Sequence, residues 1–553
     1  MNIRNFHLQR LVIKIMGILL MAYPMSMESQ ERNFPEQPKR EVRAVWLTTI
    51  GGLDWPHSYS QSERSAEKQK NELRQILDQY ERIGINTVLV QTRIRATVIY
   101  PSDIEPWDGC LSGFPGTSPG YDALSFIIDE CHKRGMEIHA WIATMPLGRW
   151  DGYGCRLFRR KHPSLARKID GYGYMNPEAS GTGDYLADLC EEITKRYDID
   201  GIHLDYIRYP ETWKIKVSKD QGRQYITSIV RKIHDKVKAA KPWVKMSCSP
   251  VGKYDDLTLY WSHGWNANDR VCQDAQGWLR DGLMDELFPM MYFRDNQFFP
   301  FAIDWKENDY GKIVAPGLGI YFLHPKEANW PLKDIVRELY GLRDIGLGQA
   351  FFRGKFLTDN VKGLYNFMER FNTQPSLVPA MTWESEIKPA TPQLYLDKKT
   401  QTISYHSEGD VYYNIYVDGQ LTLARTPRTS LHYKKGHQYA ICAMNRYGNE
   451  SAPVYYPEIA REDEDNVQEE GLLHSDGLTV YAPLASGLSK KDLIMVTTIQ
   501  GTPIAYKPWR GTTVDVRDVK DGFYCLKSVN KKGKTHRLGF FQIRRFLRKN
   551  GFN

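Results

Sequence analysis

One carboxylate stands at the end of a short apolar run and is the first candidate for chemistry. In residues 200–210, Ile202 and Leu204 alternate with His203 and Asp205. If this run is a strand of a parallel sheet, its two-residue period turns the aliphatic pair towards covering helices and turns His203 and Asp205 inward. Asp205 then lies at the carboxyl end of the strand, where parallel barrels place their reacting groups. The structural alternative is that Asp205 caps the next helix or pairs with the arginine three residues later.

Polar and aromatic residues occupy the same place on other predicted strands. A purely structural barrel would fill such positions with Val, Ile and Leu, because burying polar groups without a ligand is costly. Aromatic rings can stack on the C–H faces of sugars, while Gln, Arg, His and Asp can bond to sugar hydroxyls. This set of inward-facing polar and aromatic residues therefore predicts a carbohydrate site. His203, one layer below, is expected to be a core residue that orients Asp205. The expected substrate-binding residues are Trp46, Gln91, Arg93, His139, Trp141, Tyr206, Arg208, Tyr292 and Tyr321.

Hydrolysis of a glycosidic bond usually needs two carboxyl groups. Asp205 is the first choice, as nucleophile or as electrostatic stabiliser of the oxocarbenium-like centre. Asp295 follows another predicted strand end, in the run 292–295, and is our choice for the catalytic acid. An arginine precedes it, and a neighbouring arginine favours the ionised form of an acid, which suits a nucleophile better than a proton donor. Three acids in predicted loops are rivals for the second role: Asp54, Glu178 and Glu211.

Other chemistries lack their sequence signatures. No predicted strand end carries a phosphate-binding or dinucleotide fingerprint, and no HExxH or HxH run offers metal ligands. No serine stands in a GxSxG elbow. We therefore expect no cofactor and no metal. The formal net charge of +8 over 553 residues is mild; it does not call for nucleic acid, although it tolerates an anionic polymer.

From residue 41 to about 372, strand-like runs alternate with helical segments, which indicates a parallel α/β fold. Eight such units in a span of this length predict a (β/α)8 barrel. Aliphatic and polar residues alternate in several of the runs, as the two faces of a barrel strand require. The expected strands are 42–49, 87–93, 137–143, one from 201, 244–249, 286–292, 312–321 and 348–352.

The N-terminus has the layout of a signal peptide. Arg4 and Arg10 precede an apolar run over 11–22, and small residues follow before a polar segment. The run is too short for a comfortable membrane span. We expect residues 1–29 to be a signal peptide and the protein to be exported, to the periplasm, the cell surface or the medium, with no stable span after cleavage. The eight cysteines are scattered without metal-like spacing, and no disulfide can be assigned among them.

Two small all-β domains are expected after the barrel. Short strand-like runs over 383–458 suit a β-sandwich, and the segments 413–419 and 443–450 resemble a fibronectin type III module. We expect this module to act as a spacer. An acidic linker precedes a second β domain over 472–546, whose segment 521–526 resembles C-terminal sorting domains of Bacteroidetes-type bacteria; a plain sandwich is the alternative.

The barrel segments also resemble the glycosyl-hydrolase-like family ten of bacterial exported proteins. That resemblance implies a glycosidase and gives Asp205 the position of the family's strand-four aspartate. It also implies a candidate substrate, peptidoglycan glycan strands stripped of their peptides. After strand two, however, Arg93 is followed by Ile94, Arg95 and Ala96 where relatives have proline, a small residue and aspartate. The matching segments are 41–49, 90–93, 119–122, 132–135, 139–142, 175–177, 200–210, 249–250 and 288–292.

The sequence thus predicts an exported glycoside hydrolase acting on a polysaccharide, with Asp205 central. Two alternatives stay open. One is a non-catalytic glycan-binding barrel, and the other is a metal-dependent carbohydrate esterase.

Overall fold

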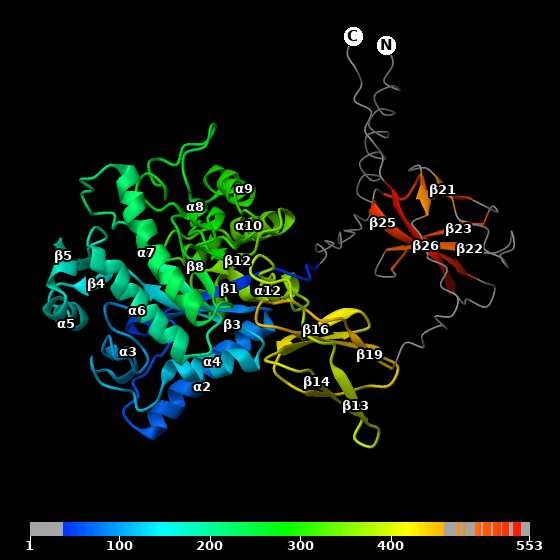
Figure 1. The fold of residues 1–553 in the computed structure, drawn as a ribbon, viewed down its shortest axis with the longest axis horizontal. Coiled ribbons are helices and arrows are strands. Elements are labelled where there is room, and N and C mark those ends of the chain that lie inside the picture. The colour runs from blue at the N-terminus through cyan, green and yellow to red at the C-terminus, as the bar shows by residue number, and fades with distance from the viewer. Residues whose placement is uncertain are drawn as a thin grey trace, which may run out of the picture. The chain divides into compact units, whose positions relative to one another are not determined.

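The computed structural model describes residues 37–457, 473–475, 479–481, 493–498, 502–509, 513–520, 522–529 and 535–543. The predicted signal peptide, residues 1–29, lies outside them. The chain divides into two compact units that meet between Val454 and Tyr455. The first unit holds an α/β barrel and a small β module, coloured blue to yellow in Figure 1.

A parallel sheet forms the centre of the first unit. Its strand order is β10-β9-β8-β7-β3-β2-β1-β12-β11, and every pairing between neighbours is parallel. The predicted strands are all present, several of them shorter than expected. They are β1 (Arg43–Leu47), β2 (Thr87–Arg93), β3 (Glu137–Ala143), β7 (Gly201–Asp205), β8 (Lys245–Cys248), β9 (Glu286–Leu287), β10 (Ile313–Val314), β11 (Gly317–Leu318) and β12 (Gln349–Phe351).

The seventh predicted strand, 312–321, is interrupted. Its two pieces, β10 and β11, are separated by Ala315 and Pro316, and proline has no N–H to donate to a ladder. Pairing nevertheless continues across the break, because the N–H of Ala315 donates to Leu287 and the carbonyl of Pro316 accepts from Ala350. The two ends of the sheet order are therefore parts of one strand, and the eight strands close into a (β/α)8 barrel.

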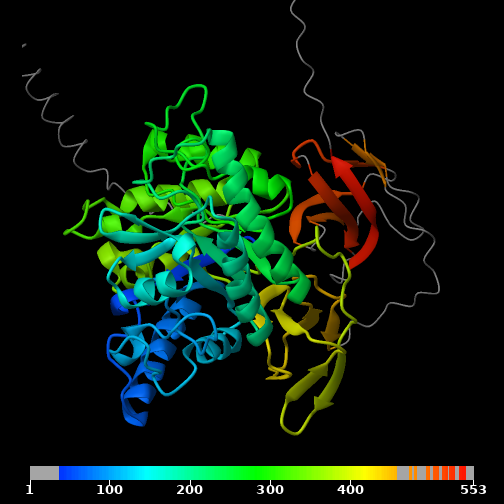
Figure 2. The same cartoon turned by 60° about the vertical axis from the view of Figure 1, so that its left-hand side comes forward.

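Helices surround the barrel (Figures 1 and 2). Several begin at a side-chain cap: Ser62, Asp122 and Ser218 accept hydrogen bonds from backbone N–H groups of the first turns of α2, α4 and α7. The covering helices are α2 (Glu63–Arg82), α4 (Ala123–Lys133), α6 (Ser180–Arg196), α7 (Lys219–Ala240), α8 (Ala275–Arg280), α9 (Phe299–Glu307), α10 (Leu332–Asp344) and α12 (Leu364–Phe371). Shorter helices are α3 (Gly109–Ser112), α5 (Tyr153–Lys161) and α11 (Gly354–Thr358), and β4 (Pro146–Arg149), β5 (Ala166–Ile169) and β6 (Tyr172–Met175) form a small sheet inserted between β3 and α6.

The two faces of β7 carry the side chains that the alternation predicts. Ile202 and Leu204 belong to the large core between strands and helices. His203 lies inside the barrel, in edge contact with Trp46 and Phe288. The inward direction of Asp205 follows from the same parity, and its hydrogen bond to Trp141 confirms it.

The residues after the barrel form two antiparallel sheets. One has the order β13-β14-β17 and the other β16-β15-β18-β19. The predicted β-sandwich over this region is thus present in outline, while its assignment to the fibronectin type III class stays a prediction. The strands are β13 (Gln393–Asp397), β14 (Thr402–His406), β15 (Tyr412–Val417), β16 (Gln420–Thr426), β17 (Ser430–His432), β18 (Tyr439–Met444) and β19 (Val454–Tyr456).

This β module is bound to the barrel by ion pairs, two of which involve the buried carboxylate of Asp200. Arg425, which lies at the end of β16, pairs with Asp200 and donates to the carbonyl of Met136 at 3.1 Å. Arg446 pairs with Asp198 at 2.7 Å and lies 3.4 Å from Asp200. Asp200 immediately precedes β7. The module therefore holds the amino end of the strand that carries Asp205, which is more than the spacer role expected of it.

The second unit has two antiparallel sheets of its own, β20-β21-β24 and β23-β22-β25-β26. Its described residues share an apolar core that includes Val480, Val496, Leu526 and Phe541. This confirms a small all-β domain, and its likeness to sorting domains stays a prediction. The strands are β20 (His474–Ser475), β21 (Thr479–Tyr481), β22 (Leu493–Thr498), β23 (Pro503–Pro508), β24 (Thr513–Asp515), β25 (Gly522–Val529) and β26 (Thr535–Ile543).

In the part of the chain that the structure describes, none of the helices combines the length and apolar character that crossing a bilayer requires. The eight cysteines are all buried and carry free thiols.

Candidate active site

Asp205 is the centre of the site, at the carboxyl end of β7. Its side chain is held by three donors: Trp141 Nε1 donates to Oδ2 at 3.0 Å, and both Ser249 Oγ (2.9 Å) and the backbone N–H of Tyr206 (2.8 Å) donate to Oδ1. The residue is only 7% exposed. Oδ1 thus accepts two hydrogen bonds and Oδ2 one, which leaves Oδ2 as the oxygen with room for a further partner.

Burial raises the pKa of Asp205 above its ordinary value. The hydrogen bond from Ser249, the charge of Arg208, the hydrogen bond from Trp141 and the N–H of Tyr206 oppose this effect without cancelling it. None of these influences is a second carboxylate. Desolvation of Asp205 therefore favours its neutral form, while the fixed donors favour its anion.

Tyr206 gives the mouth an accessible aromatic ring next to Asp205. It is 38% exposed and its backbone has φ = 55°, in the left-handed region that costs a non-glycine residue about 1–2 kcal/mol. Such outliers concentrate at functional sites. Arg208 lies beneath the ring, with its guanidinium carbon 4.7 Å from the ring centre.

Two further tyrosines line the mouth from the segments that follow β9 and β11. Tyr292 and Tyr321 are both partly exposed and meet edge to face at 5.8 Å, and Tyr292 stacks on Phe352 at 5.5 Å. Burial, followed by the negative charge of Asp205, raises the pKa of Tyr292 well above its ordinary value. The structure thus brings Tyr206, Tyr292 and Tyr321 together around the end of the barrel, as the sequence predicts.

Arg208 is almost completely buried and links the site to a second carboxylate. Its Nη2 bonds to Glu211 at 2.7 Å, while Nε and Nη1 have no hydrogen-bond partner among the described residues. Burial acts to raise the pKa of Glu211, but the charge and hydrogen bond of Arg208 outweigh it and lower that pKa. Of the three rival acids, Glu211 is therefore connected to Asp205 through a shared cation, and its low pKa favours the anion.

Asp295 does not have the surroundings expected of a proton donor. Its side chain is 62% exposed and pairs with Arg337 of α10 at 3.1 Å, and no hydrogen bond joins it to Asp205 or its donors. The apolar burial that would favour a neutral acid is absent at this position. Its role as catalytic acid thus stays a prediction without structural support.

Among the described residues, the other two rivals for the acid role form no hydrogen bond to Asp205 or to its donors. Asp54 is buried and accepts hydrogen bonds from Arg353, from the backbone N–H of Lys355 and from that of Thr48. Glu178 is exposed, with Tyr209 donating to it at 3.4 Å.

Three of the expected sugar-binding residues lie in the interior instead. Arg93 is fully buried, clamps Glu105 with Nε and Nη2, and donates Nη1 to the carbonyl of Thr144 at 2.9 Å. Trp46 is buried and donates its indole N–H to His203 Nε2 at 3.3 Å. The polar groups of these two side chains bond to protein partners, so they support the mouth instead of facing substrate. His139 is the third of these interior residues.

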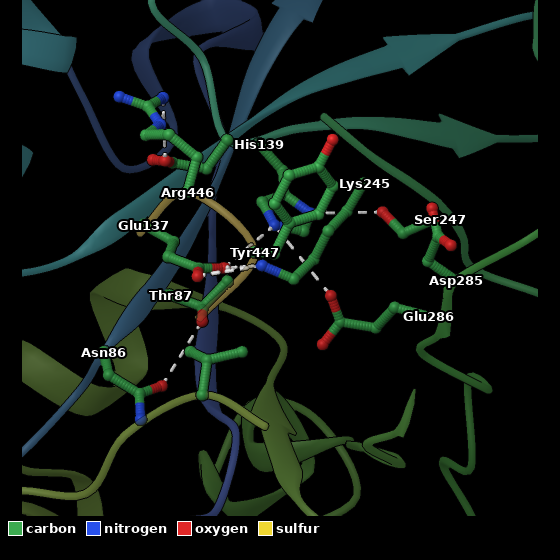
Figure 3. Close-up of polar contacts among 12 residues, drawn as sticks. Asn86, Thr87, Glu137, His139, Lys245, Ser247, Asp285, Glu286, Arg446 and Tyr447 are labelled. Carbon is green, nitrogen blue, oxygen red and sulfur yellow. Dashed lines mark hydrogen bonds and ion pairs between the residues drawn. The ribbon is translucent and has the colours of Figure 1, made fainter. Parts of the chain in front are cut away.

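His139 belongs to a polar column inside the barrel, part of which is drawn in Figure 3. Because Trp46 donates to Nε2 of His203, a neutral His203 carries its proton on Nδ1 and donates it to Ser247 Oγ at 3.1 Å. Burial lowers the pKa of both His139 and His203, which favours their neutral forms. Ser247 Oγ also lies 3.2 Å from Nδ1 of His139, and the other ring nitrogen of His139 lies 3.6 Å from Glu137 Oε2.

The lower end of this column is charged. Lys245 bonds to both oxygens of Glu137 at 2.8 Å, and Glu286 Oε2 lies 3.9 Å from His139 Nε2 (Figure 3). Burial raises the pKa of Glu286 to about 8, with Lys245 opposing and Glu137 and Asp285 adding to the rise. These carboxyl groups lie at the starts of β3 and β9, below Asp205, and are therefore separate from the mouth.

The remaining expected residue, Gln91, shapes the loop after β1. Its Oε1 accepts from the backbone N–H groups of Thr49 (3.2 Å) and Ile50 (2.9 Å).

Ser249 is the partner of Asp205 that sequence reasoning did not single out. The signal was available, since Lys245, Ser247 and Ser249 share the inward parity of β8.

Within the described residues, no group of three or more His, Cys, Asp or Glu side chains is arranged to hold a metal ion.

This barrel, with a desolvated carboxyl and aromatic rings at the carboxyl ends of its strands, is a glycoside-hydrolase-like barrel. The model of the family "Glycosyl hydrolase-like 10" matches residues 41–225 and 216–322, and the chain belongs to that family.

Curated relatives agree with this assignment. The glycosyl hydrolase YngK of Bacillus subtilis (strain 168) is 28% identical over 501 residues, covering 80% of this chain and 96% of the relative. The glycosyl hydrolase DigH of Escherichia coli (strain K12) is 28% identical over 295 residues, covering 47% and 67%. The match to YngK spans more of the chain than the barrel alone.

Among solved structures, the glycoside hydrolase domain of PgaB (BpsB) from Bordetella bronchiseptica is 10% identical with a TM-score of 0.42. It covers 60% of this chain and 98% of that domain.

Proposed function

We propose that the protein is an exported glycoside hydrolase that cleaves a polysaccharide with Asp205 as its reacting carboxyl. The observation that carries the proposal is the setting of Asp205, fixed by Trp141 and Ser249 beside the exposed ring of Tyr206. Family membership supports the class of reaction. The N-terminal segment, with its signal-peptide layout, supports export.

Oδ2 is the oxygen proposed to face the scissile bond, because it accepts one hydrogen bond where Oδ1 accepts two. Trp141 and Ser249 hold the carboxyl from two neighbouring strands, so its orientation is set before substrate binds. In the ionised form Oδ2 stabilises positive charge at the anomeric carbon or attacks it. Burial, which raises the pKa, makes that anion more reactive towards a cationic centre.

The proposed substrate is a peptidoglycan glycan strand that has lost its peptides. Two features of the chain support this choice. The tyrosines of the mouth offer faces for successive sugar rings, and the buried charge of Arg208 together with the mild positive charge of the chain suits a polymer that carries carboxylates.

The Asp205→Asn variant tests the proposal. It keeps the shape of the side chain and one acceptor oxygen, which can hold the hydrogen bonds from Ser249 and Tyr206. The amide nitrogen cannot accept from Trp141, and the side chain cannot act as an anion, so we expect turnover to fall by about 10²–10⁴-fold while glycan binding persists. Release of reducing ends from amidase-treated peptidoglycan measures turnover, and sedimentation with the same glycan measures binding. Asp295→Asn and Glu211→Gln are assayed in parallel to identify the second carboxyl.

The control for this experiment addresses the two alternative functions. A non-catalytic binder would show no turnover in the wild type or in the Asp205→Asn variant, although both would bind glycan. A metal-dependent esterase would lose its activity on exhaustive chelation, whereas the proposed hydrolase keeps it.

A further inference from the structure

The long loop between β8 and α8, residues 249–274, begins at the carboxyl end of β8 and extends from the barrel (Figures 1 and 2). Its first residue is Ser249, the hydroxyl partner of Asp205. Near its tip two large apolar side chains face solvent: Leu259 is 84% exposed and Trp261 is 60% exposed. An exposed tryptophan on a loop of the mouth needs an explanation beyond packing.

The loop is built as a rigid element. Val251, Ala267 and Val271 form a small buried core of their own, with Tyr254 and Trp265 packed against it. The backbone N–H groups of Leu257 and Tyr260 each donate to the other residue's carbonyl, at 2.9 and 3.2 Å, which closes a tight turn.

The backbone around Trp261 is held from below. Lys253 is almost completely buried, donates to Gln297 and lies over the ring of Phe293 at 4.2 Å. Gln297 in turn donates to the carbonyl of Trp261 at 3.4 Å. On the other side, Asp256 accepts from the backbone N–H of Ser262 at 2.8 Å. The indole of Trp261 is therefore presented by a braced backbone, with the ring of His263 beside it at 4.6 Å.

The same loop is continuous with the mouth. The guanidinium of Arg208 lies between two rings, 4.7 Å from the centre of Tyr206 and 5.8 Å from that of Trp265. A line of aromatic groups thus leads from Tyr206, next to Asp205, to Trp265 and on along the loop that carries Trp261. Each ring can stack on the C–H face of a sugar.

We propose that Trp261 is a stacking platform for a distal sugar ring of the glycan, outside the cleavage site. This proposal rests on the proposed function, since it assumes a glycan in the mouth. It assigns the loop a role in chain-length preference: a long glycan reaches Trp261 while its scissile bond lies at Asp205, and a short oligosaccharide does not. Leu259, more exposed but without an aromatic face, has no part in it.

The experiment compares Trp261→Ala and Trp261→Phe with Leu259→Ala as the matched control from the same loop. Values of kcat/KM are measured for short oligosaccharides and for long strands of the same amidase-treated peptidoglycan glycan. We expect Trp261→Ala to lose about five- to tenfold on long strands and nothing on the shortest hydrolysed oligosaccharide. Trp261→Phe recovers most of the loss, and Leu259→Ala matches the wild type.

Equilibrium binding in the Asp205→Asn background separates this proposal from the function on which it rests. If the wild type neither cleaves nor binds any glycan, the proposed function fails. If long strands are cleaved and bound but Trp261→Ala leaves the preference for length unchanged, only the platform is overturned. Sedimentation with anionic lipid vesicles supplies another contradicting result: vesicle binding that depends equally on Trp261 and Leu259, without any effect on glycan, would assign the tip to a membrane surface.

Discussion

Trp141 and Asp205 are joined across neighbouring strands, with the indole N–H of one donating to Oδ2 of the other at 3.0 Å. Trp141 lies on β3 and Asp205 ends β7, and both side chains point into the barrel. The bond fixes the carboxyl and at the same time stabilises its anion. Trp141 therefore acts on Asp205 through its nitrogen, rather than on substrate through its ring, since it is almost completely buried.

Replacing Trp141 by Phe tests this relationship. The change removes the protein donor to Oδ2 and keeps an aromatic side chain. A hydrogen bond to a charged group contributes about 1.5–3 kcal/mol, so we expect the pKa of Asp205 to rise further, by about one unit or more. The pH dependence of kcat/KM would show its acidic limb at higher pH, together with about a tenfold loss of activity. An unchanged limb would mean that another group titrates there.

Ser249 and Ser247 offer a matched pair, because both face inward from β8 and only Ser249 contacts Asp205. We expect Ser249→Ala to shift the acidic limb upward, because the hydrogen bond from Ser249 is the largest of the influences that lower the pKa of Asp205, although Oδ1 keeps the N–H of Tyr206. Ser247→Ala breaks the link between His203 and His139 and should lower the melting temperature without moving the limb. Equal shifts in both variants would contradict the assignment of Ser249.

The raised pKa of Glu286 predicts that the stability of the protein depends on pH. Its pKa is raised to about 8 in the folded protein, against about 4.3 in an unfolded chain. Between these values the folded state binds more protons than the unfolded state, so the free energy of unfolding falls as pH rises through this window. Glu286→Gln cannot ionise, and we expect its melting temperature to exceed that of the wild type increasingly from pH 5 to pH 9. Activity at neutral pH serves as the control and should be unaffected, since Glu286 lies below the mouth.

The ion pair between Arg425 and Asp200 predicts that the stability of the barrel depends on the β module. Arg425→Ala leaves the buried carboxylate of Asp200 short of a cation, and breaking such a pair typically costs about 3–5 kcal/mol. Thermal unfolding followed by tryptophan fluorescence should show the barrel melting at a lower temperature. Arg428, exposed in the same module, provides the control, because Arg428→Ala should leave the melting temperature unchanged. A barrel that melts normally in Arg425→Ala would restore the spacer role expected from the sequence.

Much of the barrel was predictable because its signals are local. Alternation within 200–210 indicated which side chains of β7 face inward, and proline at 316 was visible although its effect on pairing was not predicted. The β10–β11 break depends on how neighbouring strands supply the remaining hydrogen bonds, which no single segment specifies. The same limit applied to Ser249, whose role appears only when β8 lies beside β7.

The candidate site was harder to predict than the fold. Arg93 was assigned to substrate from its parity, but it is the last residue of β2, the register shifts between Gln91 and Arg93, and its side chain bonds to Glu105 of the following loop. Trp46 and His139 were misplaced for another reason: an inward direction is shared by all layers of a barrel, and only the last layer reaches the mouth. Tyr206, Tyr292 and Tyr321 stand at or beyond strand ends, and for these the sequence position and the spatial position agree.

The ion pairs of Asp200 with Arg425 and Arg446 have a consequence for the order in which the chain can fold. Asp200 and Arg425 are 225 residues apart, and Asp200 opens the strand that ends in Asp205. While the polypeptide is being synthesised from its N-terminus, the eight barrel strands are complete before this cation exists. Until residue 425 and then 446 have emerged, the carboxylate at the start of β7 has only His132 and the N–H of Ile138 to stabilise it within the barrel. The last step in setting β7 is therefore assigned to a segment outside the barrel. A polypeptide that ends before residue 425 would carry every mouth residue without the ion pair that holds the amino end of β7.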